Sequence, residues 1–366
     1  NRSVKNLQHR KENYTSLIVE SISGFETVKN LNIKKFIKSK FALRFYKYLE
    51  EYFKFENLNN AKQILSDLIF GVGIILIIYY SAYQIYDDKF TLGYLMLFYS
   101  LSNYFIEAVK NIFNLDVNFK EACNSLKRVV GMFIEYKDEG IVNNFNFKKI
   151  KITNLTYSYN NIETILDHIN LEINNGEKIL ITGASGSGKS TLFKIFMKYY
   201  QIENNNLFID DIDYNYFSKK AISNSITYIS QNEILFSDTL LNNLNVCNSD
   251  KLKEIINLCE INSILDKRKI NLNYIVEENG FNFSGGEKQR IILGRALQKD
   301  FKILLIDEGL NQMDVNLERR ILKRLFSKYS DKTIIIVSHR LNNLDLYDRN
   351  IEIKGGKIVK DVKKSE

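Results

Sequence analysis

The sequence contains no proline, no tryptophan, and only three cysteines and three histidines. Cys123, Cys247 and Cys259 are too scattered for a metal cage or a disulfide framework, which indicates a reducing compartment for the soluble part. Because proline is absent, glycine, charge and hydrophobic pattern are the remaining markers of chain boundaries. The chain begins at Asn1 and has no secretory signal pattern, so we expect it to be a piece of a longer protein.

Charge and length leave two broad classes open. A chain of 366 residues should hold more than one domain, and its net charge of +8 suits either nucleic acid or an anionic membrane surface. Residues 1–64 carry many of the Lys and Arg side chains and have apolar positions at helical spacing. We therefore expect long helices in water over this first stretch.

Two apolar runs predict membrane helices, at about 65–86 and about 91–112. The first carries a single charge over about 22 residues, which is long enough to cross a bilayer core of roughly 30 Å. The second is less apolar, and only a short turn around 87–90 separates the two runs, so we expect a hairpin. By the positive-inside rule both of its ends face the cytoplasm. The alternative, two buried helices of a soluble core, fits poorly because the first run is apolar all round.

The second half of the chain predicts an α/β domain at 147–362, joined by a linker at 135–146 to the membrane part at 1–134. Short runs of β-type residues alternate there with helical ones, as in a largely parallel sheet. The runs expected to be strands are 150–159, 178–183, 226–230, 302–307 and 333–338.

A phosphate-binding loop follows the second of these strands. Its glycines free backbone N–H groups to wrap phosphates, its lysine adds a positive charge, and its serine hydroxyl can ligand Mg²⁺. The alternative is a flexible Gly/Ser turn. It fits less well, because such a turn does not require the strand before it and the helix after it. The residues expected to hold the nucleotide are Gly183, Ala184, Ser185, Gly186, Ser187, Gly188, Lys189, Ser190 and Thr191.

A second anion site lies about 95 residues after Lys189. Ser284, Gly285, Gly286 and Glu287 precede an apolar helical stretch, so they predict a helix N-terminus that can bind a phosphate. One chain cannot easily bring both sites to the same phosphate. The pair therefore indicates an ATP machine made of two subunits.

Catalytic side chains are predicted at two strand ends. Asp307 should hold the Mg²⁺ shell, and Glu308 should act as general base for the attacking water. His339 follows the strand at 333–337 and is expected to reach the γ-phosphate. Acidic pairs and lone histidines are often plain surface, and His9 and His168 are interpreted as solvated or locally bonded.

These motifs together resemble the ATP-binding cassette of ABC transporters over about 147–360. They stand in family order at Gly183–Ser190, Gln231, Ser284–Arg290, Asp307, Glu308, Asp314 and His339. The resemblance implies that Tyr159 stacks on adenine, that Gln231 touches Mg²⁺ and water, and that Asp314 lies at the dimer seam. It also implies the fold class: an α-helical membrane segment followed by an α/β P-loop NTPase domain.

The seam departs from the family pattern. Asn311-Gln312-Met313-Asp314 stands where Ser-Ala-Leu-Asp is usual, Gly309 precedes it, and Phe283 replaces a leucine at the start of the signature. The aspartate is kept, which favours hydrolysis. We expect the altered seam to affect the coupling between the two ATP sites and not hydrolysis itself.

The hairpin resembles the last two membrane helices of an ABC exporter. The segment Glu20–Lys29 resembles the cytoplasmic loop that docks on the partner's cassette. Phe113-Asn114-Leu115 with Ala122 and Arg128 resembles the peptidase-containing bacteriocin exporters. The resemblance implies Lys189, Gln231, Glu308 and His339 as catalytic residues, with ATP and Mg²⁺ as cofactors. It further implies a second subunit in a homodimer, a peptide cargo and membrane lipid as partners, with no nucleic acid.

Three alternatives stay open at this stage. The chain could export a lipid or a drug instead of a peptide. It could be a soluble cassette ATPase that acts on DNA or ribosomes, although those that act on DNA place a long coiled coil between the two phosphate motifs. It could also be a membrane protein whose cassette binds ATP without hydrolysing it, against which the intact catalytic residues argue.

Overall fold

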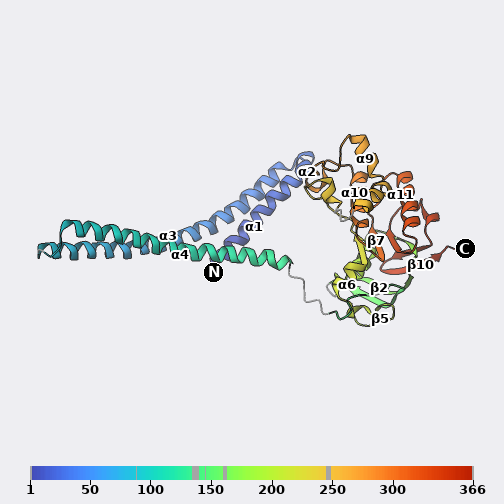
Figure 1. Ribbon diagram of the computed structural model, residues 1–366, viewed down its shortest axis with the longest axis horizontal. Helices are drawn as coiled ribbons and strands as arrows, with labels where there is room; N and C mark the ends of the chain where they lie inside the picture. The colour runs from blue at the N-terminus through green and yellow to red at the C-terminus, as the bar shows by residue number, and fades with distance from the viewer. Residues whose placement is uncertain are drawn as a thin grey trace. The chain divides into compact units, whose positions relative to one another are not determined.

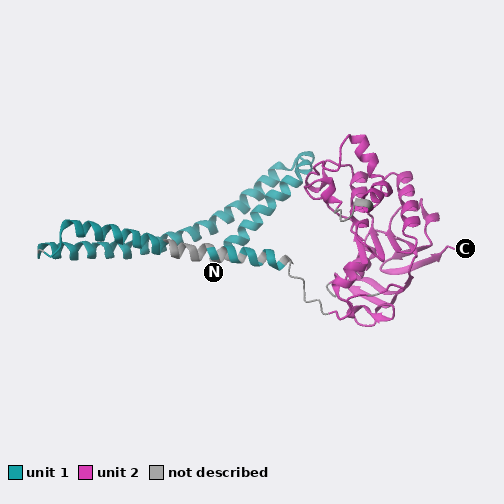
Figure 2. Ribbon diagram, viewed as in Figure 1, with its two compact units in different colours: residues 1–134 teal, residues 135–366 magenta. Residues whose placement is uncertain are grey.

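The computed structural model divides the chain into two units, residues 1–134 and 135–366, shown in teal and magenta in Figure 2. The structure describes residues 2–87, 89–133, 140–144, 146–159, 163–244 and 249–364. Cys247, the side chains of 113–115 and of Arg128, and half of the predicted linker lie outside the described residues.

The first unit is entirely helical among the residues described (Figure 1). Its helices are α1 (Arg2–Ser23), α2 (Phe25–Asn30), α3 (Lys34–Tyr86) and α4 (Leu92–Phe133). With 53 residues, α3 is about 80 Å long at 1.5 Å per residue. The segment Glu20–Lys29 is the end of α1, a turn at Gly24 and most of α2.

Helix α3 has two different neighbours along its length. Near its start, the ring of Tyr14 from α1 lies 5.2 Å from Phe41 and 5.3 Å from Phe45, centroid to centroid. Further along, α4 returns beside it, and the Lys110 ammonium lies 2.6 Å from the Asp67 carboxylate. The predicted hairpin is therefore present.

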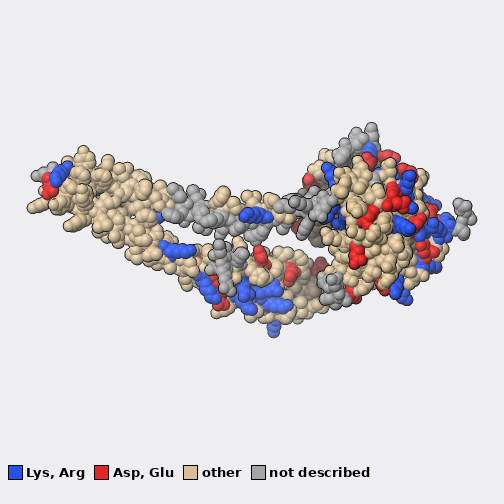
Figure 3. Space-filling model, turned by 90° about the horizontal axis from the view of Figure 1, so that it is seen from below, with Lys and Arg blue, Asp and Glu red and all other residues tan. Residues whose placement is uncertain are grey.

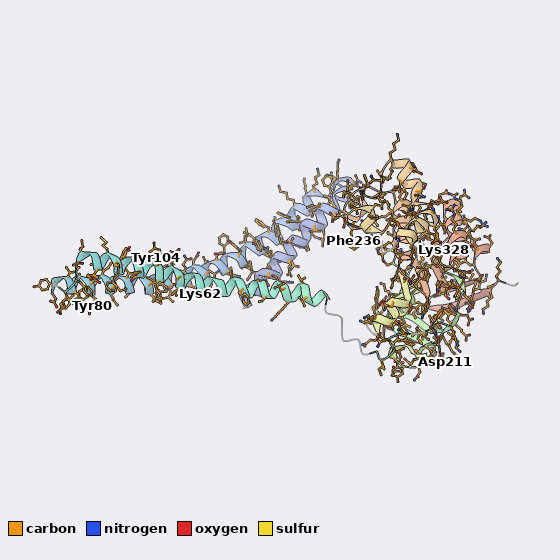
Figure 4. The ribbon with its side chains drawn as sticks, in the orientation of Figure 1. Lys62, Tyr80, Tyr104, Asp211, Phe236 and Lys328 are labelled. Atoms are coloured by element: carbon orange, nitrogen blue, oxygen red, sulfur yellow. The ribbon has the colours of Figure 1, made fainter. Side chains whose placement is uncertain are left out.

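The far part of the hairpin is apolar and exposed. Side chains from Leu65 to Leu76 that face outward include Leu68, Ile69 and Val72, each more than half exposed. On the face in Figure 3 this stretch is almost without charge, and Figure 4 places Lys62 at one end of it and Tyr80 near the hairpin tip. Among the described residues, α3 is the one helix long and apolar enough to cross a membrane. The second span, at about 91–112, is helical and stays a prediction as a membrane segment.

The second unit contains two sheets. A six-stranded sheet has the order β10-β9-β3-β8-β7-β6, and a four-stranded antiparallel sheet has the order β2-β1-β4-β5. The strands of the larger sheet are β3 (Lys178–Thr182), β6 (Ile226–Ile229), β7 (Ile303–Asp307), β8 (Thr333–Val337), β9 (Arg349–Lys354) and β10 (Lys357–Lys363). Those of the smaller are β1 (Lys149–Ser158), β2 (Thr164–Asn174), β4 (Leu207–Ile209) and β5 (Ile212–Asp213).

All neighbours in the larger sheet are parallel except β10, which runs antiparallel to β9. Its central strands β3, β7 and β8 are buried along their whole length. Alternate residues face opposite cores: Leu304 and Ile306 face one, and Ile303 and Leu305 the other. Strands buried on both faces read as continuous apolar runs, and that is how the sequence located them.

One strand was assigned to the wrong sheet. The run 150–159 was expected among the parallel strands, but β1 belongs to the antiparallel sheet, where it pairs with β2 and β4. Its burial alternates along the strand, because one face packs on the core and the other is solvated. The alternation of apolar and polar residues around Ile150 and Ile152 is typical of such a strand with one solvated face.

Helices cover the larger sheet on both faces. They are α5 (Lys189–Phe196), α6 (Lys219–Ser225), α7 (Leu240–Asn243), α8 (Ser249–Leu258), α9 (Ile261–Arg268), α10 (Gly285–Leu297) and α11 (Val315–Lys328), with short 3₁₀ turns at Tyr214–Tyr216, Glu278–Gly280 and Leu344–Leu346. Apolar residues of α8 to α11 share one core with Leu304, whereas α5 and the smaller sheet share the other with Ile303. Both cores hold the same parallel strands in place.

Candidate active site

The phosphate-binding loop connects β3 to α5 through three glycines with positive φ. The φ angle is 147° at Gly183, 79° at Gly186 and 97° at Gly188. A Cβ atom on Gly183 would lie 2.1 Å from the carbonyl oxygen of Ile353, so no other residue fits there without moving the backbone. These angles wrap the loop ahead of the α5 N-terminus, where backbone N–H groups are free to meet an anion.

Lys189 lies inside the curve of this loop. Its ammonium donates to the carbonyl oxygens of Gly183 at 2.9 Å and Ala184 at 2.7 Å, and to the Ser187 hydroxyl at 3.2 Å. Burial lowers the pKa of Lys189, while the nearby carboxylates Glu308 and Asp307 act in the opposite direction. The cation therefore stands where a bound phosphate could exchange for these carbonyl partners.

Asp307 ends β7 and is almost fully buried, with 2% of its surface exposed. The hydroxyl of Tyr228 donates to its carboxylate at 3.3 Å, and the hydroxyl of Ser190 bonds to it as well. Burial raises the pKa of Asp307, and these two hydrogen bonds partly offset the rise. A carboxylate beside a serine hydroxyl is an oxygen donor set of the kind that Mg²⁺ takes together with phosphates and waters, so the residues fit that ion.

Glu308 is held by side chains from both neighbouring strands. Its Oε2 accepts from the Gln231 amide at 2.9 Å, and its Oε1 lies 2.9 Å from Nε2 of His339. Its backbone has φ 55°, and its N–H donates to the carbonyl of Val337 at 3.1 Å. A non-glycine residue in this region costs of order 1–3 kcal/mol, so the surrounding contacts must fix the position of this carboxylate.

The strand order explains why these residues meet. In the parallel sheet β3, β8, β7 and β6 are successive neighbours, and their carboxyl ends share one edge. The loop at Gly183, His339, Glu308 and Gln231 follow these four strands in that order. The carboxyl edge of an open parallel sheet is where such folds bind ligands. The predicted residues of this half of the site are therefore brought together.

The second anion site is at the start of α10. Ser284 caps the helix: its hydroxyl accepts from the N–H of Glu287 at 3.4 Å, and the Glu287 carboxylate accepts from the N–H of Ser284 at 2.8 Å. The Arg268 guanidinium donates to both oxygens of Glu287, at 2.9 and 2.6 Å. Although burial opposes it, the bonds from Arg268 and Ser284 lower the pKa of Glu287 to about 2.

The side chain of Glu287 is therefore occupied within its own chain. What the motif presents outward is the helix N-terminus with Gly285 and Gly286. No hydrogen bond or ion pair among the described residues joins Ser284–Gly286 to Gly183–Thr191. The two predicted phosphate-binding features are thus separate within one chain.

Tyr159 lies beside the phosphate loop in an aromatic group. Its hydroxyl is 2.9 Å from the hydroxyl of Thr191, and 46% of its surface is exposed. Its ring meets Tyr157 and Tyr200 edge-on, with centroids 5.5 and 5.2 Å away. The sequence did not single out Tyr200 or Tyr228, although both follow within about 40 residues of the loop. Only their packing identifies them.

Asp314 caps α11, because its carboxylate accepts from the N–H groups of Asn316 and Leu317 at 2.9 and 3.3 Å. The residues before it are tied to their neighbours: Asn311 accepts from the Ser338 hydroxyl at 3.1 Å, and the carbonyl of Met313 accepts from Arg340 at 2.7 Å. The unusual seam is thus an ordered part of the cassette.

The remaining histidines have local partners, as expected. His9 lies 3.2 Å from the amide of Asn13, and His168 bonds to its neighbour Asp167. Cys259 is buried, which raises the pKa of its thiol to about 12, and Cys123 lies on α4. Neither cysteine belongs to the site.

Two family models match the chain. Residues 166–311 match the model described as ABC transporter, and residues 1–109 match the ABC transporter transmembrane region. The chain thus carries both an ABC transporter transmembrane region and an ABC transporter cassette. The predicted fold class, a helical membrane region followed by an ABC cassette, is confirmed by these matches.

Among similar ABC transporters is the lactococcin-G-processing and transport ATP-binding protein LagD of Lactococcus lactis subsp. lactis. It is 31% identical over 355 residues, which cover 94% of this chain and 50% of LagD, so this chain spans about half the length of that relative. The ATP-dependent lipid A-core flippase of Vibrio vulnificus is 24% identical over 372 residues, covering 99% of this chain and 64% of the flippase.

A solved structure shares the fold. The structure of a bacterial Atm1-family ABC exporter with ATP bound gives a TM-score of 0.84 at 21% identity, over 99% of this chain and 65% of that one. At this identity the likeness concerns the ABC exporter fold alone. The roles of individual residues rest on the geometry of this chain.

Proposed function

We propose that this chain forms the C-terminal part of one subunit of an ATP-driven peptide exporter. The observation that carries the proposal is the Glu308 carboxylate, held at 2.9 Å by both Gln231 and His339 beside the phosphate loop. This arrangement is suited to ATP hydrolysis, because a base, its orienting groups and a phosphate cradle share one sheet edge.

ATP would bind with its phosphates on the N–H groups of Gly183–Thr191 and its base on Tyr159. Lys189 would exchange its loop carbonyl partners for phosphate oxygens. Ser190, Gln231 and Asp307 would hold Mg²⁺, which neutralises charge on the phosphates when bound. The half-exposed ring of Tyr159 leaves a face on which an adenine can stack.

Glu308 would accept a proton from the attacking water. The water oxygen then forms a bond to the γ-phosphorus while the bond to the bridging oxygen breaks and ADP leaves with that electron pair. Gln231 and His339 would hold the two carboxylate oxygens, and His339 would also contact the γ-phosphate. These two contacts would set the direction in which the carboxylate faces.

A second subunit would complete each site. The free N-terminus of α10, with Ser284, Gly285 and Gly286, would meet the γ-phosphate of the ATP held by the partner, and Glu287 would stabilise that N-terminus. Asp314 would lie at the seam between the two cassettes. Loss of the γ-phosphate removes the shared anion, so the cassettes can separate and drive the membrane helices.

Peptide cargo is the finer part of the proposal. It is supported by the resemblance to LagD, which is named for lactococcin G, at a higher identity than to the flippase. The transmembrane match over 1–109 argues against a soluble ATPase acting on DNA or ribosomes. If lipid but not peptide raised the ATPase rate in reconstituted vesicles, the cargo proposal would be wrong and lipid export would replace it.

The variant Glu308→Gln tests the hydrolysis proposal. It keeps the size and the contacts but removes the base, so we expect ATP turnover to fall at least about 100-fold while ATP binding stays. Phosphate release and nucleotide retention would be measured on the full-length protein in vesicles. Glu203→Gln, the same change at an exposed position, is the matched control. Turnover near the wild-type rate in Glu308→Gln would remove Glu308 from the role of base.

A further inference from the structure

Gln289 lies on α10, one helical turn after the glycines of the second anion site. Its side-chain oxygen accepts from the backbone N–H of Gln312 at 2.9 Å. Its side-chain nitrogen faces the carbonyl oxygen of Glu308 at 3.5 Å, a long hydrogen bond. The two ends of one amide thus match a donor and an acceptor on the segment that follows β7.

Gln312 also packs tightly against the start of α10. A Cβ atom on Gly285 would lie 1.9 Å from the side-chain oxygen of Gln312, and one on Gly286 would lie 3.0 Å from the Gln312 carbonyl oxygen. The seam residue therefore packs directly on the glycine pair, where the resemblance leads one to expect an alanine. The start of α10 and the seam are in contact through backbone and side chain together.

The same segment leads to the catalytic carboxylate. The carbonyl of Glu308 also accepts from the N–H of Asn311 at 3.3 Å. This carbonyl belongs to the residue with φ 55°, whose side chain would meet the water. A pull on the carbonyl can rotate that residue, because its backbone conformation is kept only by its surroundings.

There is room for such a movement. A cavity of about 270 Å³ lies beside the Gln289 bridge, by which we mean the two contacts of its amide with Gln312 and Glu308. Gln289, Gln312, Gly309 and Gln231 are among the residues that line this cavity. Close-packed interiors transmit small shifts, whereas a cavity allows one element to move against another. The bridge is thus the contact that would carry a shift of α10 across this gap.

We propose that Gln289 is a positioning residue that couples the two ATP sites served by one chain. The inference rests on the proposed cassette dimer, in which α10 contacts the partner's ATP while Glu308 acts on its own. When the partner's γ-phosphate draws the α10 N-terminus toward it, Gln289 passes the shift to the carbonyl of Glu308. Each base is then aligned only when the other site holds ATP, and hydrolysis becomes cooperative in ATP.

Two substitutions separate the two ends of the amide. Gln289→Met removes both hydrogen bonds and keeps the length of the side chain. Gln289→Glu keeps an acceptor for the N–H of Gln312 but loses the donor to Glu308. The matched controls are Gln201→Met and Gln201→Glu, because Gln201 is an exposed glutamine of the same cassette.

The measurement is the ATP dependence of hydrolysis by the full-length protein in vesicles. We expect a Hill coefficient approaching about 2 for the wild type, since two sites act together. In both Gln289 variants it should fall toward 1 together with a lower kcat, because the base loses the contact that aligns it. The Gln201 controls should keep the wild-type curve. A fall in Gln289→Met without one in Gln289→Glu would overturn the assignment to the carbonyl of Glu308.

Other results would also overturn the coupling role. A wild-type Hill coefficient of 1 would do so, as would Gln289 variants that lose kcat and melting temperature while keeping the wild-type curve shape. The proposed function is tested separately, by the Glu308→Gln variant. If Glu308→Gln still turns ATP over, the hydrolysis proposal fails whatever the shape of the Gln289 curves.

Discussion

Glu287 and Glu308 are both glutamates at the end of a regular element, but their surroundings give them different roles. Glu308 has an amide and an imidazole as partners and lies beside the phosphate loop. Glu287 is 8% exposed and bonded to the Arg268 guanidinium. A partly buried ion pair ties α9 to the start of α10. The Glu308 carboxylate is therefore available for chemistry, whereas that of Glu287 serves stability.

The depressed pKa of Glu287 predicts a pH dependence of stability. Its pKa falls from 4.5 to about 2 on folding, so its contribution is present above pH 4.5 and is lost as pH falls toward 2. The contribution at pH 7 is roughly 3 kcal/mol. We expect Glu287→Gln to lower the melting temperature of the cassette at pH 7, and the difference from wild type to shrink at pH 3.

Glu203→Gln is the control for this experiment, because Glu203 is exposed. A Glu287→Gln difference of equal size at both pH values would contradict the ion-pair explanation. It would show that the loss comes from packing and not from the charge.

At the scale of elements, the start of α10 was predicted from the sequence, whereas the cap of α11 and the partners of the strands were not. Ser284 and Asp314 have short polar side chains at the N-caps of α10 and α11, where such residues satisfy free N–H groups. The run that became β1 looked like the parallel strands. Its sheet was decided by pairing with β2 and β4, which lie elsewhere in the sequence.

Asp314 allows its two roles to be separated at this scale. Asp314→Ala removes the cap and should cost about 1 kcal/mol of stability, whereas Asp314→Asn keeps a capping oxygen and should cost little. If Asp314 also acts at the dimer seam, both variants should lower the ATPase rate. Melting temperature and phosphate release measured on the same samples decide this, and a normal rate in Asp314→Asn would limit the residue to capping.

At the scale of the whole molecule, the apolar part of the α3–α4 hairpin determines where the chain resides. Leu76 is 61% exposed within this stretch, and Leu43 is 59% exposed on the same helix before it. A lysine near the middle of a membrane helix costs about 2.5–3.5 kcal/mol of insertion free energy. The two leucines are about equally exposed, so a lysine at either position should cost a similar amount in water. Only a lysine at position 76 would also carry the cost of insertion into a bilayer.

We therefore expect Leu76→Lys to lower the fraction of the chain that stays in membranes after an alkaline wash. Leu43→Lys should leave that fraction unchanged, because this position lies in the part expected in water. Equal retention of both variants would argue against a membrane span at 65–86.

The sequence by itself determined the class of protein and most of the predicted site. Apolar runs located the buried strands and the membrane segment, and glycines with charged or hydroxyl partners marked both phosphate motifs, because these signals are local in the chain. The tertiary structure decided what depends on distant pairing. It placed Gln231 and His339 on Glu308, Arg268 on Glu287, and Gln289 between Gln312 and Glu308. These contacts follow from the order of β3, β8, β7 and β6 and from the packing of α10, which no local pattern specifies.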